Sequence, residues 1–217
     1  KALQRLYNCR KNTCVPISGR DVLLIMQIAF FDDPERLTAQ VNSLCEELEK
    51  RIKEDVSIAP KNAPRILITG TPMAVPNWKM HNIVETSGGI VVCEENCTGT
   101  RYFTNTVKEN NQTMEEAASS LTERYFNNIH CACFTPNPER IDDILRLAKE
   151  YQVDGILNVN LKFCNLYATE NYFVERRLKE EGYKVLSLET DYEDSDAEQL
   201  RTRVSAFLEM IEANKTN

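Results

Sequence analysis

The sequence predicts an α/β fold, in which helices cover both faces of a parallel sheet. Short apolar segments alternate with longer segments of helical periodicity after residue 64, a pattern typical of βαβ units. Successive βαβ units make right-handed crossovers between parallel strands. We expect this domain over residues 65–217 and a helical segment over residues 1–58 before it.

Two helices are expected in the segment that precedes the sheet. Residues 18–30 are apolar nearly all round, and Ser18 can cap their first turn. Pro34 can begin a second helix, in which leucine and valine recur at helical spacing. Residues 59–64 contain two prolines and no periodicity, so we expect a linker there.

Four apolar segments are expected to form the strands, at residues 65–69, 90–93, 154–160 and 184–188. Five segments with helical periodicity lie between or after them, at residues 76–87, 115–127, 138–151, 168–181 and about 195–213. Prolines can start the first and third of these helices, with Asn137 as a cap. We expect the flavodoxin-like strand order 2-1-3-4, in which the topological switch point lies between the first and third strands.

Composition and charge exclude several classes of protein. The chain has 217 residues and a formal net charge of −7, whereas nucleic acids and anionic membranes select basic surfaces. No apolar run approaches the roughly 20 residues that span a bilayer, and no secretion signal opens the chain. We therefore expect a cytoplasmic protein that binds neither nucleic acid nor membrane. The first residue is Lys1, and we interpret the chain as a fragment without its N-terminal half.

Three cysteine sites fall next to expected strand and helix ends. In a reducing compartment, such cysteines more often bind metals or act in catalysis than form disulfides. Cys97 follows the second expected strand and Cys164 follows the third. Cys131 and Cys133 come shortly before the helix that Pro138 starts. All three sites therefore belong at the carboxyl edge of the sheet, where ligands bind.

Thiolates gathered at this edge suggest a metal or iron–sulfur site. Helix N-termini present free amides and a positive dipole end, which favour thiolates and anionic clusters. The alternative is a set of unrelated buried cysteines, because cores often contain cysteine and no CxxC pair gives zinc-type spacing. Cys45 and Cys93 are expected in the core, and no role is assigned to Cys9 and Cys14.

The loop after the second strand offers further anion-binding groups. Thr98 has a hydroxyl, Gly99 a backbone amide and Arg101 a guanidinium, which can hold a cluster sulfide, a phosphate or an anionic substrate. A tight loop that requires glycine at position 99 is the alternative. The sequence contains no GxxxxGK[ST] or GxGxxG motif, so it lacks those ATP and NAD sites.

Four motifs carry a resemblance to a known family. They are VVCEENCTGTRYF, IHCACFTPNPER, DGILNVNLKFCNLYATE and LETDYEDSDAEQLRTRVSAFLEMI. In this order they resemble the 2-hydroxyacyl-CoA dehydratase and benzoyl-CoA reductase family, which includes the D-component of 2-hydroxyglutaryl-CoA dehydratase. Within the family they are most similar to the double-cubane cluster proteins. The segment PISGRDVLLIMQIAFFDDPERL resembles the stretch that precedes this domain in that group.

The resemblance implies a site and the partners that complete it. Members have two similar α/β domains whose cysteines together hold [4Fe-4S] clusters, joined by a sulfide into an [8Fe-9S] double cubane in some of them. This chain resembles the C-terminal half. The implied ligands are Cys97, either Cys131 or Cys133, and Cys164, and an N-terminal domain or partner subunit supplies the others. Asn165 stands where related chains often have histidine.

The resemblance also implies a function. In this family an ATP-dependent iron–sulfur activator protein supplies one electron of low potential. Dehydratases use it to convert a 2-hydroxyacyl-CoA, through a ketyl radical, to the 2-enoyl-CoA, whereas double-cubane proteins reduce small molecules. We expect the iron–sulfur component of an ATP-activated reductase of the double-cubane type, which forms a dimer and is inactive as a fragment. The alternatives are a dehydratase subunit that acts on an acyl-CoA, and a non-catalytic electron-transfer or scaffold subunit with structural or zinc-binding cysteines.

Overall fold

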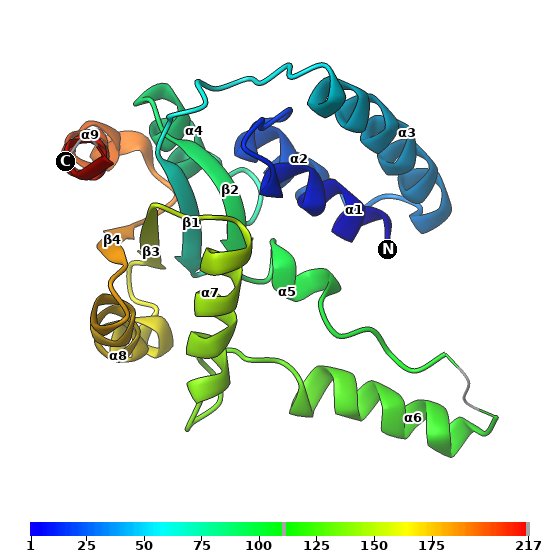
Figure 1. Ribbon diagram of the computed structural model, residues 1–217. Coiled ribbons are helices and arrows are strands. Elements are labelled where there is room, and N and C mark those ends of the chain that lie inside the picture. The colour runs from blue at the N-terminus through cyan, green and yellow to red at the C-terminus, as the bar shows by residue number, and fades with distance from the viewer. Residues whose placement is uncertain (110–111, 216–217) are drawn as a thin grey trace.

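The computed structural model describes residues 1–109 and 112–215, and within them four parallel strands form a sheet (Figure 1). The strands lie in the order β2-β1-β3-β4, which confirms the predicted order. They are β1 (Arg65–Gly70), β2 (Ile90–Glu95), β3 (Gly155–Leu161) and β4 (Lys184–Thr190). Because all neighbours pair in parallel, the carboxyl ends of the strands meet at one side of the sheet, here called the carboxyl edge.

The helices precede, connect and follow these strands. They are α1 (Ala2–Asn8), α2 (Gly19–Ile28), α3 (Pro34–Lys53), α4 (Lys79–Thr86), α5 (Thr100–Phe103), α6 (Met114–Thr122), α7 (Pro138–Glu150), α8 (Asn165–Glu180) and α9 (Ala197–Lys215). Shorter helical turns lie at Cys9–Lys11, Glu123–Asn127 and Asp194–Asp196. In the described part of the chain, no helix has the length and apolar character of a membrane span.

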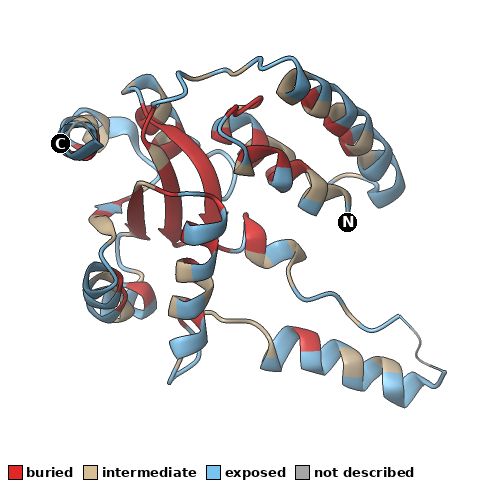
Figure 2. Cartoon of the chain, in the orientation of Figure 1, coloured by how far each residue is buried: buried red, intermediate tan, exposed pale blue. Residues whose placement is uncertain are grey.

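Apolar cores lie on both faces of the sheet, as predicted. On β1, Leu67 belongs to one core, while Ile66 and Ile68 belong to the other, because successive side chains of a strand point to opposite faces. The first core packs α7 and α8, together with α1 and α3, against the sheet. The second packs α4 and α9. The central strands are consequently shielded from solvent, and β2 is buried at every position (Figure 2).

Two helices begin at other residues than predicted. α4 begins at Lys79 rather than at residue 76, because the chain first turns, with the Asn77 N–H donating to the Ala74 carbonyl. α8 begins at Asn165, three residues before the predicted start, and Cys164 is its N-cap residue. The earlier start brings this cysteine directly onto the end of a helix.

Local side-chain roles also differ from the prediction. Asn137 precedes α7 but does not cap it, since its amide donates to the Cys131 carbonyl at 2.9 Å and to Glu170 at 3.2 Å. The short helices α1 and α5 were not predicted, because one or two turns are too few to show a helical period. α5 lies in a segment that was predicted to be a loop.

Residues 1–58 contribute to the same core as the sheet. Leu6, Val41 and Leu48 from this segment belong to the apolar cluster that also contains Leu67 of β1 and Ile144 of α7. The division into residues 1–58 and 65–217 stays a prediction. The shared core means that the two parts stabilise each other.

A buried ion pair connects the N-terminal segment to β2. The Arg10 Nη2 atom donates to Glu94 Oε2 at 2.8 Å, and the two side chains are 0% and 1% exposed. The Tyr7 hydroxyl donates to the same carboxylate at 2.7 Å, and His81 Nε2 of α4 lies 3.1 Å from its other oxygen. Because a buried charge without a partner is costly, this cluster holds α1 and α4 to the strand.

Replacing Glu94 by alanine is expected to lower the free energy of unfolding by about 3–5 kcal/mol, because Arg10 would remain buried without its partner. Urea unfolding of the whole chain measures this change. Glu49→Ala is the matched control, since it removes a partly exposed carboxylate that pairs with Arg5 of α1, and pairs open to solvent contribute little. Equal effects of the two substitutions would contradict the assignment.

The same carboxylate gives the fold a specific pH dependence. Burial by itself raises the pKa of Glu94, but the charge of Arg10 and hydrogen bonds from His81 and Arg10 outweigh it and lower the pKa from 4.5 to about 2. Its stabilising contribution is therefore complete above pH about 4.5 and is lost as the pH falls to about 2. Over this range, urea unfolding should show a larger loss of stability in the natural protein than in Glu94→Gln. An equal loss of stability with falling pH in the natural protein and in Glu94→Gln would contradict this role of Glu94.

Candidate functional site

Four cysteines lie on segments at the carboxyl edge and are here called the edge cysteines. Cys97 follows the end of β2 and Cys164 follows the end of β3. Cys131 and Cys133 precede α7, whose N-terminus is at the same edge because α7 leads back into β3. Only β1 separates β2 from β3, so the ends of these strands are about 10 Å apart at ordinary strand spacing.

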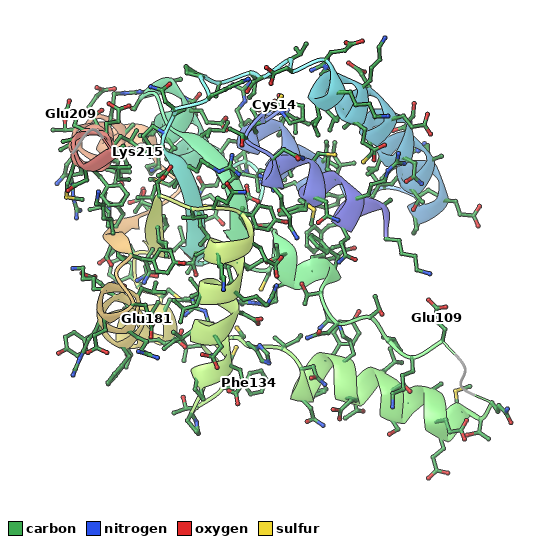
Figure 3. All side chains as sticks on the ribbon, viewed as in Figure 1. Cys14, Glu109, Phe134, Glu181, Glu209 and Lys215 are labelled. Carbon is green, nitrogen blue, oxygen red and sulfur yellow. The ribbon has the colours of Figure 1, made fainter. Side chains whose placement is uncertain are left out.

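Exposure separates the edge cysteines from the other four. Cys97 and Cys133 are exposed and Cys131 and Cys164 are partly exposed. The remaining cysteines, which are Cys9, Cys14, Cys45 and Cys93, are buried. Figure 3 shows Cys14 far from Phe134, the neighbour of Cys133. The predicted core positions of Cys45 and Cys93 are confirmed, and only the edge cysteines have thiols that an external ligand can reach.

Arg101 and Tyr167 link three of the edge cysteines. The Cys131 and Cys133 sulfurs are 3.2 Å apart. Arg101 Nη1 lies 3.7 Å from Cys97 Sγ and donates to the Tyr167 hydroxyl at 3.0 Å. That hydroxyl is 3.9 Å from Cys131 Sγ. The structure therefore brings the loop of Cys97 and the loop of the cysteine pair to the same two side chains.

Cys164 reaches this edge through its place in the chain. It is the N-cap residue of α8, three residues before Tyr167. No contact links its thiol to another edge cysteine in residues 1–109 and 112–215. Over the same residues, no three metal-ligating side chains stand at metal-binding distance from one another. Contacts with Arg101 and Tyr167 thus connect Cys97 to the cysteine pair, whereas Cys164 shares only the edge, and the described residues form no closed metal site.

A buried network of charged groups holds the loops in place. Glu95, at the end of β2, pairs with Arg101 and accepts a hydrogen bond of 2.6 Å from Thr69 of β1. Arg140 of α7 donates to Thr69 Oγ1 at 3.0 Å and forms an ion pair with Glu170 of α8. These contacts join β1 and β2 with α5, α7 and α8 behind the cysteines.

Glu95, Arg140 and Tyr167 were not predicted as site residues. One signal was available for Glu95, since two consecutive glutamates close an otherwise apolar strand at the edge where ligands bind. Arg140 is only 1% exposed, yet it follows a proline at a helix start, where a charged residue is ordinary. Nothing local to Tyr167 separates it from other helix residues.

The three residues predicted to bind an anion have different surroundings. Thr98 Oγ1 accepts a hydrogen bond from the Met73 N–H at 3.1 Å and donates one to Asn96 Oδ1 at 3.0 Å. This hydroxyl therefore connects the loop after β2 to the loop after β1. A Cβ atom at Gly99 would lie 2.3 Å from the Glu94 carbonyl oxygen, so the loop requires glycine. Of these three residues, Arg101 is the one whose side chain has a described contact with a cysteine sulfur, at 3.7 Å from Cys97 Sγ. A ligand-binding role for these residues stays a prediction.

The two thiols of the Cys131/Cys133 pair differ in pKa. Burial by itself raises the pKa of Cys131, but the backbone N–H and thiol of Cys133, together with the positive Arg101, lower it below its ordinary value. The hydrogen bond with Cys131 is the main cause that raises the pKa of Cys133. Cys131 is therefore the first thiol of the pair to lose its proton as the pH rises, and thiolates are the form that binds metals.

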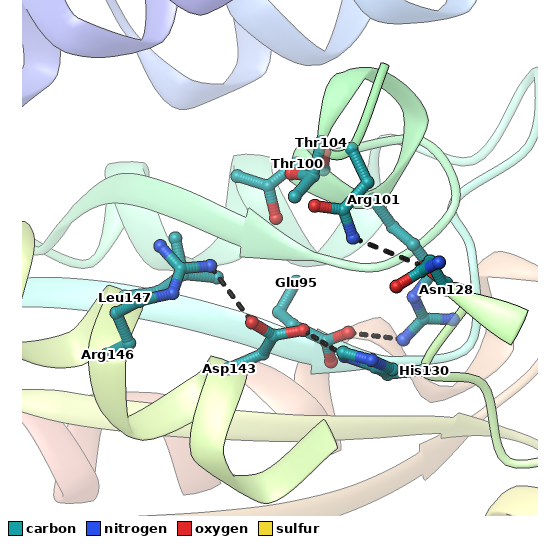
Figure 4. A pocket seen from close by; sticks show the side chains of 10 residues that line it. Glu95, Thr100, Arg101, Thr104, Asn128, His130, Asp143, Arg146 and Leu147 are labelled. Atoms are coloured by element: carbon teal, nitrogen blue, oxygen red, sulfur yellow. Dashed lines mark hydrogen bonds and ion pairs between the residues drawn. The ribbon is translucent and has the colours of Figure 1, made fainter. Parts of the chain in front are cut away.

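Two hollows adjoin the cysteine loops. In the first, a cavity of about 20 Å³, His130 Nδ1 lies 2.6 Å from Asp143 Oδ2, and Arg146 donates to the same carboxylate at 3.0 Å (Figure 4). This volume fits a single water molecule. The second is a groove of about 570 Å³, mostly apolar, with Phe134 and Phe173 in its walls. It begins at the cysteine pair and follows the first turns of α8.

Comparisons with known proteins relate the chain to dehydratase subunits. The family model for 2-hydroxyglutaryl-CoA dehydratase, D-component, matches residues 1–211. YjiM of Escherichia coli (strain K12), a putative dehydratase subunit, is 33% identical over 213 residues, which are 97% of this chain and 54% of YjiM. The (R)-phenyllactyl-CoA dehydratase beta subunit of Clostridium sporogenes is 24% identical over 187 residues, 86% of this chain and 47% of that subunit. The chain thus spans about half the length of these relatives.

Alkylation of the folded chain should distinguish the two groups of cysteines. We expect iodoacetamide to modify the edge cysteines first, because their thiols are at least partly exposed, and to reach the buried four only after unfolding in urea. Peptide mass spectrometry at successive times measures the order. Early modification of Cys45 or Cys93 would contradict the described burial.

Proposed function

Because this chain belongs to the 2-hydroxyglutaryl-CoA dehydratase D-component family, we propose that it is part of a subunit of a 2-hydroxyacyl-CoA dehydratase. Such an enzyme removes water from a 2-hydroxyacyl-CoA and gives the 2-enoyl-CoA. The observation that carries the proposal is the family match over residues 1–211, which includes every edge cysteine. The names of both relatives, a putative dehydratase subunit and a dehydratase beta subunit, support the same reaction class.

The edge cysteines would hold an iron–sulfur cluster in this enzyme. Their chemistry fits such a group in part, since thiolates are its ordinary ligands. The described residues contain no closed set of metal ligands, so further ligands would come from outside this chain. Cys97, Cys131 and Cys164 are the proposed ligands, and the lowered pKa of Cys131 favours it over Cys133. When bound, a [4Fe-4S] cluster would supply one electron of low potential, received from an ATP-dependent iron–sulfur activator.

This chain's own side chains would tune the bound group. Arg101 places a positive charge 3.7 Å from Cys97 Sγ, which offsets the negative charge of bound thiolates. The Tyr167 hydroxyl lies beside Cys131 and can donate a hydrogen bond to its sulfur. The N-terminus of α8 adds its positive dipole end next to Cys164.

A second domain or partner subunit would cover the edge. Apolar side chains surround it, among them Phe163, which is 95% exposed, Leu166 and Phe173. Exposed apolar patches of this kind mark interaction surfaces. The nine-residue α6 extends away from the sheet with no buried residue (Figure 1), and helices this short are not stable alone. The missing cluster ligands and a dimer contact would both come from the partner at this surface.

A reductase of the double-cubane type is the second candidate. Cys131 and Cys133 place two sulfurs 3.2 Å apart, which offers more thiols than a single cluster needs from this half of a subunit. An [8Fe-9S] group would use such an extra ligand. In that case the electron would reduce a small molecule, and no acyl-CoA would be dehydrated.

Metal content and activity test the proposal. The full-length protein that contains this chain should be purified without oxygen, together with its partner. We expect about four iron atoms, and as many acid-labile sulfides, per copy of the full-length protein. Cys97→Ala and Cys164→Ala should lose most of this iron, while Cys14→Ala, which changes a buried cysteine away from the edge, should keep it. With the activator, ATP and a 2-hydroxyacyl-CoA, the natural protein should release the 2-enoyl-CoA.

The contrary outcomes are distinct. About eight iron atoms per copy of the full-length protein, without release of 2-enoyl-CoA, would favour the double-cubane reductase. Zinc in place of iron would favour a non-catalytic subunit with structural cysteines. Full iron content in the Cys97 and Cys164 variants would remove these residues from the ligand set.

A further inference from the structure

The turn that contains Cys131 and Cys133 has the geometry of a reactive dithiol. The Phe134 N–H donates to the Cys131 carbonyl at 3.0 Å, which closes a four-residue turn. Within it, the two sulfurs lie on the same side, 3.2 Å apart. Ala132 is 7% exposed and anchors the turn, while the Cys133 side chain faces solvent. Two thiols are thus held together at a place that small oxidants can reach.

We propose that Cys131 and Cys133 form a reversible disulfide with each other when no metal group occupies them. A disulfide bond is about 2.05 Å long, so the sulfurs must approach by about 1 Å. The turn lies outside regular helices and strands, so side-chain rotation and a small backbone shift can supply this movement. This modification is independent of the proposed dehydratase function, because it requires only the chain itself.

The reaction needs an oxidant, and a small disulfide such as oxidised glutathione is sufficient. A thiolate of the pair attacks one sulfur of the small disulfide, forms a mixed disulfide and expels one small thiolate. The second thiolate of the pair then attacks the mixed disulfide and expels the other. The two cysteines lose two electrons and two protons, and the oxidant becomes two molecules of its thiol.

The other cysteines do not offer an equivalent site. Cys9 and Cys45 lie within hydrogen-bonding distance of each other, but both are buried, at 4% and 0% exposure. Cys97 is exposed, but its described neighbour is the guanidinium of Arg101 rather than a sulfur. Only the Cys131/Cys133 pair combines a sulfur partner with access from solvent among the described residues.

Mass spectrometry of the metal-free whole chain tests the proposal. After incubation with oxidised glutathione and trapping with iodoacetamide, the tryptic peptide of residues 125–140 should have lost two hydrogen atoms and carry no alkyl group. Two of the eight thiols should disappear from a thiol count, and dithiothreitol should restore both. Cys9 and Cys45 should stay reduced.

Matched variants make the result specific. Cys133→Ser should leave glutathione attached at Cys131 or no change there, and should abolish the loss of two hydrogens. Cys97→Ser should oxidise as the natural chain does. Stable glutathione adducts on both members of the natural pair, or a disulfide that joins Cys131 to Cys97 or Cys164, would overturn the proposal. Iron content and dehydratase activity do not enter these measurements, so failure of the proposed function would leave the outcome unaffected.

Discussion

The paired burial of two neighbouring carboxylates on β2 is the constraint on which the rest of the structure depends. Glu94 and Glu95 are both buried at the end of an otherwise apolar strand. Both lie against arginine side chains, as expected where desolvation of a lone charge costs several kcal/mol. Glu94 meets Arg10 and His81. Glu95 meets other partners, from α5 and α7.

These two carboxylates attach different parts of the molecule to the sheet. Through Glu94, the N-terminal helices are fixed to the sheet, and the shared apolar core adds to this attachment. Through Glu95, Arg101 and Arg140 are fixed behind the cysteine loops. The strand therefore connects fold stability to the position of Cys97, whose sulfur lies beside Arg101.

The edge itself is well supported and yet open. The network behind it is buried, whereas the thiols in front of it face solvent or are partly covered. Exposed apolar side chains lie around the edge and on α6, which has no buried residue. Exposed apolar surface of this kind is typical of interaction sites. The chain spans about half the length of these relatives, and the proposed second domain or partner subunit would cover this open edge.

The sequence by itself determined the strand order, the burial of Cys45 and Cys93, the segments that carry the edge cysteines and the family. The strand order, the burial and the positions of the segments follow from local periodicity, helix-starting residues and the connection rules of βαβ units, which depend on short stretches of chain. The family followed from the resemblance of four sequence motifs. Tertiary structure alone decided which side chains meet. Arg10 and Glu94 are 84 residues apart in the chain, and Arg101 and Tyr167 are 66 apart, so no local pattern relates them. The start of α8 at Asn165, directly after Cys164, likewise differs from the start that periodicity predicted. Helix boundaries and buried ion pairs depend on the free energy of contacts made across the whole fold, and those contacts exist only after the chain has folded.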